Sequence, residues 1–171
     1  MASSLIANPA PHQGPFGPTR YATPSAGETY KVGDYLIRHT DGKLKIAAAA
    51  GNNVGSGDMV GVALHNAADA LAGTYRADGM GAYAPFMPGF RARHPLYHGT
   101  PASAVLTEAV IDTPTDLELR NEGGIWCFDV SATSNPKFRM ESMAPGSAYS
   151  ETYGQAEGVL LPAADLMDAV A

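Results

Sequence analysis

The stretch 30–64 constrains the fold most strongly, because it places an Asp-Gly pair between two segments of strand-like composition. Tyr35–Thr40 is rich in the aromatic and β-branched residues that fit a pleated surface. Asp41-Gly42 follows, and a two-residue type I′ turn favours this pair because both central positions need positive φ. Lys43–Ile46 then alternates polar and apolar residues. We therefore predict a β-hairpin whose second strand turns its apolar side chains towards a core and its lysines towards water.

Further segments repeat this strand pattern along the chain. Alternating or continuous apolar runs of four to eight residues, bounded by Gly, Pro or Asn, are typical of short strands. The clearest second hairpin has Asn121–Gly124 as its turn. The predicted strands beyond the first hairpin are 59–64, 117–120, 125–130, 137–143 and 154–161.

Two regions are less regular. Residues 82–90 contain Pro85 and Pro88, and because proline cannot donate to a strand ladder, we expect an edge strand or an ordered loop there. Pro101–Ala109 is the best helix candidate, with a strand over 104–111 as the competing prediction. Residues 163–171, which lie outside the residues described below, carry a second predicted short helical face formed by Leu166, Met167 and Val170.

These patterns predict a mainly β fold: a small β-barrel or sandwich with an extended Pro/Gly-rich N-terminal arm and at most two short helices. The length of 171 residues fits one domain with attached arms. We expect the arm over 1–29, the domain over 30–163 and a short tail over 164–171.

The arm carries spaced apolar residues between its prolines and glycines. A disordered tail is the default for such a terminus. However, an extended arm with apolar anchors can also lie in a groove on a neighbour, and its prolines lower the entropy cost of docking. We predict a docking arm whose partner contacts are Leu5, Ile6, Phe16, Arg20 and Tyr21.

Composition narrows the class of partner. The formal net charge is −6, and only 16% of the residues are charged. Because phosphate binding needs clustered Lys and Arg, and the basic residues here are scattered, we expect no direct nucleic acid partner. No stretch approaches ~18 apolar residues, so we expect no membrane span. The N-terminus lacks a signal-peptide pattern, which favours a cytosol-like compartment.

The sequence gives little sign of catalysis. Cys127 lies between two aromatic residues and is more typical of a buried, inert thiol than of a nucleophile. His94 and His98 have a spacing that could hold a metal on a helix, but Pro95 breaks that helix, so we expect two exposed or loop histidines. No phosphate-binding loop or nucleophile elbow occurs. We therefore predict no enzyme activity, no cofactor and no metal.

Three motifs together resemble the capsid decoration (cement) proteins of tailed bacteriophages: Gly33-Asp34, the run GDMVGVAL at 57–64, and the closing segment 153–163. The resemblance implies a β-barrel or β-tulip-like sandwich on the outer surface of the expanded capsid. It also implies a homotrimer that uses an extended terminal arm. The partner would be the major capsid protein, and the chain would be made in the host cytoplasm and end in the virion.

Other classes of function stay open. The chain could be another virion structural protein, such as a head fibre or tail component. It could be a small ligand- or carbohydrate-binding β module, in which surface tyrosines would line a groove. A β-barrel enzyme assembled from distant residues is the third alternative. The tyrosines that would line such a groove are Tyr75, Tyr83, Tyr97 and Tyr149.

Overall fold

The computed structural model describes residues 11–55, 59–113 and 115–162. They form two compact units. We call residues 11–14, 48–55 and 89–162 the barrel unit, and residues 15–47 and 59–88 the hairpin unit. The prediction of a mainly β fold is confirmed, with two short helices, α1 (Ala67–Leu71) and α2 (Glu108–Ile111), and a 3-10 turn, η1 (Pro101–Ser103).

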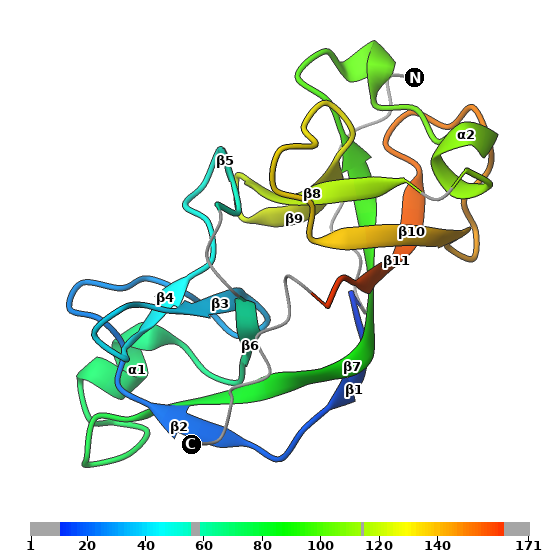
Figure 1. Cartoon of the computed structure of the whole chain (residues 1–171). Helices are drawn as coiled ribbons and strands as arrows, with labels where there is room; N and C mark the ends of the chain where they lie inside the picture. Colours follow the sequence, from blue (N-terminus) through cyan, green and yellow to red (C-terminus); the bar gives the residue numbers. More distant parts are fainter. Residues whose placement is uncertain (1–10, 56–58, 114, 163–171) are drawn as a thin grey trace. The chain divides into compact units, whose positions relative to one another are not determined.

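The barrel unit contains a closed five-stranded β-barrel, in which β8, β9, β10 and β11 gather around the second half of β7 (Figure 1). The pairing runs β7–β9–β8–β10–β11 and returns from β11 to β7. The β7–β9 pair is parallel and the others are antiparallel. The strands are β7 (Gly81–Tyr97), β8 (Asp116–Glu122), β9 (Ile125–Asp129), β10 (Phe138–Met143) and β11 (Gln155–Leu160), and β5 (Asn52–Asn53) pairs with β8 outside the ring.

Local sequence explains how this barrel closes. Gly123 and Gly124 both have positive φ, so they supply the two-residue turn that joins β8 to β9. Phe128 and Phe138 are fully buried with ring centroids 5.3 Å apart, and Phe90 lies 6.4 Å from Phe138. Three aromatic rings from β7, β9 and β10 therefore form the centre of the barrel core.

The hairpin unit is built from β2 (Arg20–Ala22), β3 (Tyr35–Arg38), β4 (Leu44–Ile46), β6 (Met59–Ala63) and the first half of β7. The pairing order is β2–β7–β6–β3–β4. Pro24 also bridges Leu44, whose amide donates to the Thr23 carbonyl at 2.9 Å. These contacts join β4 to the segment that follows β2 and so close the order of strands into a ring. The core of this unit includes Tyr30, Leu36, Leu44, Val60 and Tyr83.

The predicted first hairpin is confirmed. β3 and β4 pair with Leu36 opposite Ile46, and Gly42 has a φ of 80° in the turn between them. Leu44 is fully buried and Ile46 packs against the core, as the alternation predicts. The other predicted strands are also present, and each begins and ends within two residues of its predicted bounds.

The prediction for residues 82–90 is wrong, because they belong to β7, a 17-residue strand that pairs on both sides. The Pro85 carbonyl accepts from the amide of Gly17, which lies between β1 (His12–Phe16) and β2. This contact shows which side of β7 the polar groups of Pro85 face, and it explains why proline is tolerated. The donor that proline lacks would point to this same side, where the neighbouring strand is interrupted. The helix over Pro101–Ala109 and the strand over 104–111 are both absent; η1 and α2 take their place.

The described part of the arm is ordered against β7. β1 and β2 both pair with this strand, and Ala22 is buried in the core of the hairpin unit. The backbone of Ile46 also donates to the Glu28 carboxylate at 3.1 Å. Residues 20–28 therefore take part in the packing of the hairpin unit. The predicted division into 1–29, 30–163 and 164–171 stays a prediction.

Candidate partner-binding surface

The structure places three of the five predicted contact residues, while Leu5 and Ile6 lie outside the described residues. Phe16 ends β1 with 40% of its surface exposed, and Tyr21 in β2 is 43% exposed. Tyr21 pairs with Ala82 and Ala22 with Gly81, so the period of two that buries Ala22 turns Tyr21 outward. Arg20, opposite Tyr83, is half-buried. Sheet pairing thus fixes two aromatic side chains at the surface of one unit.

Tyr21 is held by a residue that the sequence analysis missed. The Arg76 guanidinium lies over the Tyr21 ring, 4.5 Å from its centroid. Asp78 holds Arg76 in place through a 2.7 Å contact to Nη2, and its other oxygen accepts from the Met80 amide. These bonds lower the pKa of Asp78 to about 2, with the Arg76 hydrogen bond as the largest cause. The loop after α1 therefore orders the Tyr21 side chain.

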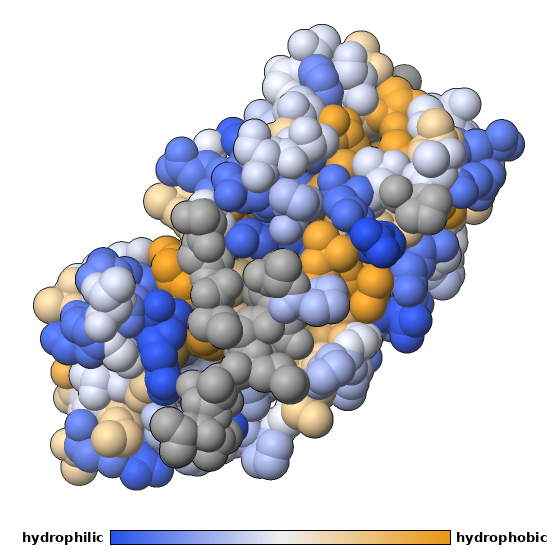
Figure 2. Space-filling model, viewed as in Figure 1, coloured by the Kyte–Doolittle hydropathy of each residue, from blue (hydrophilic) through white to orange (hydrophobic). Residues whose placement is uncertain are grey.

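Exposed large apolar side chains concentrate in the hairpin unit. Of the nine in the described residues, eight belong to this unit, and Tyr149 belongs to the barrel unit. Figure 2 shows one face of the molecule, where hydrophilic residues are widespread and hydrophobic residues form separate patches. Scattered exposed apolar residues need no explanation, whereas a contiguous apolar patch marks an interaction site, so the unit that carries eight of the nine is the candidate binding unit. The eight residues are Phe16, Tyr21, Val32, Leu64, Leu71, Tyr75, Met80 and Met87.

The exposed Tyr75 is stacked on a well-fixed histidine. Its ring centroid lies 4.0 Å from that of His65. His65 Nε2 accepts from the Ala82 amide, and its Nδ1 is 3.1 Å from the Asn66 carbonyl oxygen. An imidazole that accepts at Nε2 donates from Nδ1, and here Nδ1 faces the Asn66 carbonyl oxygen, so both ring nitrogens have a partner. His65 thus supports an exposed aromatic residue.

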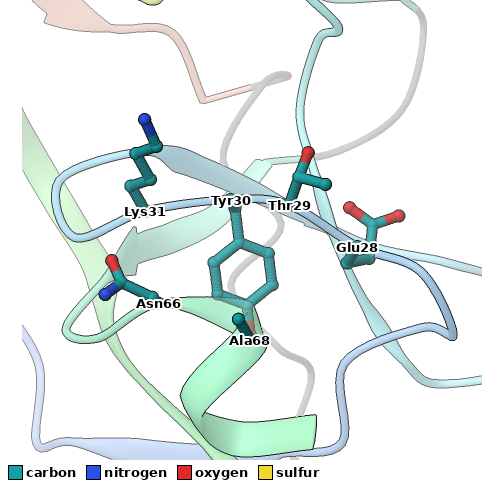
Figure 3. A pocket seen from close by; sticks show the side chains of 6 residues that line it. All are labelled: Glu28, Thr29, Tyr30, Lys31, Asn66 and Ala68. Carbon is teal, nitrogen blue, oxygen red and sulfur yellow. The ribbon is translucent and has the colours of Figure 1, made fainter.

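A pocket of about 330 Å³ also lies in the hairpin unit (Figure 3). Tyr30 points from the segment before β3 towards Ala68 in α1, while Thr29 and Lys31 point the other way. Burial, and then the nearby Glu28 carboxylate, raise the pKa of Tyr30 to about 12, so its phenol is neutral at physiological pH. The pocket is lined by Glu28, Thr29, Tyr30, Lys31, Asn66 and Ala68.

The ionic contacts of the barrel strands pair basic with acidic side chains. Arg93 Nε lies 2.8 Å from Glu157, and Arg139 lies 2.8 Å from Asp116. Arg91 likewise contacts Glu141 at 2.7 Å. These arginines are neutralised by neighbouring carboxylates, which disfavours them as phosphate contacts.

No helix in the described ranges is long and apolar enough to cross a membrane.

One of the four tyrosines considered for the groove of a ligand-binding module is not at the surface. Tyr83 is buried in the core, and Tyr97 packs under the Arg120 guanidinium at 4.4 Å. Among the described residues, no group of three or more His, Cys, Asp or Glu is arranged to hold a metal ion. His94 is buried inside the barrel, contrary to the expectation of an exposed or loop histidine.

Cys127 is buried, as predicted, and its Sγ lies 3.5 Å from the Arg120 carbonyl. Burial raises the pKa of this thiol from 9.0 to about 12. Because the thiolate is the reactive species, we expect a thiol reagent at pH 8 to modify the folded protein about 1000-fold more slowly than the urea-unfolded chain. The coloured thiolate that a chromogenic disulfide reagent releases on reaction with Cys127 measures both rates. Equal rates in the two states would contradict the buried position.

Comparison with known proteins gives no match: no family model, no curated protein and no solved structure is similar to this chain.

Proposed function

We propose that the chain is a structural protein of a tailed-bacteriophage virion that binds the outer surface of the expanded capsid as a homotrimer. It would bridge neighbouring subunits of the major capsid protein. The observation that carries this proposal is the concentration of exposed apolar side chains in the hairpin unit, with Phe16 and Tyr21 fixed on strands paired to β7. The motif resemblance of 33–34, 57–64 and 153–163 supplies the class of partner.

The physical reasoning starts from rigid anchors. Full burial of an aromatic side chain is worth roughly 2 kcal/mol, and side chains that are already ordered lose little entropy on binding. Strand pairing fixes the backbone at Phe16 and Tyr21, and Arg76 also orders the Tyr21 side chain. A protein that binds only the expanded shell stabilises it by mass action, and three modest contacts on one trimer combine through avidity.

The test is a binding measurement with purified expanded capsids. The double variant Phe16→Ala/Tyr21→Ala is expected to bind at least about 30-fold more weakly, since losing a central aromatic anchor typically costs ~2 kcal/mol or more. Both residues are exposed, so the variant should fold like the parent. Cosedimentation over a range of concentrations gives the affinity, and light scattering gives the oligomeric state.

Tyr149→Ala is the matched control, because Tyr149 is a similarly exposed aromatic residue of the barrel unit. It should leave capsid binding unchanged. Equal weakening by both variants would point to a nonspecific apolar effect, and no binding by the parent would overturn the capsid proposal. Deleting residues 1–29 is a poor test, because it removes the buried Ala22 and the strand pairing of β2.

A further inference from the structure

His94 lies inside the barrel unit, where it is 2% exposed. Its ring meets the edge of Phe128 from β9, with centroids 5.2 Å apart, and Ala156 of β11 lies opposite it in register. β8 and β10 line the interior with further buried apolar residues. These are Leu117, Leu119, Phe138 and Met140.

β1 brings a second imidazole against this buried ring. His12 lies 6.3 Å from His94 in a T-shaped arrangement and 6.2 Å from Phe90. The backbone is joined beside it, since the Pro11 carbonyl accepts from the Arg93 amide at 2.7 Å. His12 therefore packs beside both Phe90 and His94 of β7.

The geometry points to an acid-released strand: we propose that β1 leaves β7 when His94 takes up a proton. While β1 is in place, His94 is buried against the Phe128 ring, and burial disfavours the protonated imidazole relative to the neutral one. When β1 leaves, water reaches the imidazole and the proton is stabilised. When His12 is also protonated, its positive charge repels that of protonated His94, and this repulsion further favours release of β1.

The neighbouring charged groups do not offset this effect. The charged group that acts on His94 is His12 of β1, whose ring lies 6.3 Å away. Arg93 is bound to Glu157 of β11 at 2.8 Å. Glu118 of β8 and Asp129 of β9 are buried, but Glu118 accepts from Asn53 and Asn135, and Asp129 accepts from Ser131.

The direction of the pH dependence follows from proton linkage. Burial, and secondly the charge of His12, lower the pKa of His94 well below 6.5 when the strand is in place. The released state therefore binds more protons, and release becomes more favourable as the pH falls below about 6.5. For one proton, the equilibrium constant for opening should rise about 30-fold between pH 7.5 and pH 5.0.

Amide hydrogen exchange of the free protein, corrected for intrinsic chemistry, tests this inference. The Arg93 amide reports the hydrogen bond to Pro11, and its opening constant should rise about 30-fold from pH 7.5 to pH 5.0. His94→Leu should abolish the rise. His39→Gln is the matched control, because His39 lies on the exposed Asp41 turn, and it should retain the full rise.

Imidazole NMR of the unchanged protein is the second measurement, which needs no variant. His94 should stay neutral in the strand-bound state at pH 5.0. Protonation of His94 with an ordinary pKa while the Arg93 amide stays protected would overturn the inference, as would an unchanged rise in His94→Leu. Because Phe16 ends β1, release of this strand would also displace that proposed contact residue; this consequence rests on the proposed function. No capsid is present in these measurements, so a failure of capsid binding is a separate result.

Discussion

Replacing Phe128 by alanine is expected to destabilise the barrel unit by about 3–5 kcal/mol. Phe128 is fully buried and lies opposite both Leu96 and Leu119 in the strand register. Its ring packs against His94 and Phe138 at centroid distances of 5.2 and 5.3 Å. The truncation removes the shared neighbour of these two rings and leaves a cavity where three strands meet, which the surrounding β-sheet cannot collapse to fill.

Urea unfolding followed by Trp126 fluorescence measures this effect. Trp126 is the chain's single tryptophan and lies in β9, so it reports on the barrel unit. Tyr149→Ala, an exposed position in the same unit, should change the free energy of unfolding by less than about 1 kcal/mol. A Phe128→Ala midpoint as close to the parent as that of Tyr149→Ala would contradict the described core.

Local signals in the sequence were sufficient where a strand is defined by its own residues and turn. The Asp41-Gly42 hairpin is an example, because the turn needs positive φ and the return strand alternates. The β8–β9 hairpin is another, with its Gly123-Gly124 turn. In both hairpins the pairing partners are adjacent in sequence, so turn chemistry and side-chain period determine the register together.

The sequence could not predict β7, because that strand depends on partners far along the chain. It pairs with β2 and β6 in its first half and with β9 and β11 in its second half. The rule that confines proline to edge strands assumes a continuous neighbour on each side. At Pro85 the neighbouring chain passes from β1 to β2, so this rule does not apply.

The candidate surface was predicted only in part, for a similar reason. Phe16 and Tyr21 stand out in the sequence as aromatic residues in an extended, proline-rich segment. The Arg76–Asp78 pair that orders Tyr21 lies more than fifty residues later, in a loop without a distinctive motif. Burial of His94 was likewise hidden, because its surroundings come from β1, β9 and β11 and not from its sequence neighbours.

Gly61→Ala should be the most damaging change in the hairpin unit, at a cost of about 3 kcal/mol. Gly61 lies in the middle of β6, opposite Leu36 on one side and Pro85 on the other. A Cβ at this position would overlap the carbonyl oxygen of Ala84 and approach the Tyr83 ring to 2.9 Å. The obstacle is the backbone of the paired strand, which cannot rotate away as a flexible side chain could, so β6 and β7 would have to separate.

The measurement is amide exchange of β3, β6 and β7 in Gly61→Ala, with Gly99→Ala as the matched control. Gly99 has no atom within 4 Å of an added Cβ, and alanine there reduces the entropy of the unfolded chain, so a neutral or slightly stabilising effect is expected. Protection of the β6 amides in Gly61→Ala equal to that in Gly99→Ala would show that the two strands do not approach each other this closely. Faster exchange confined to Gly61→Ala would show that the run at 57–64 needs its glycine for close strand contact, whatever partner the surface binds.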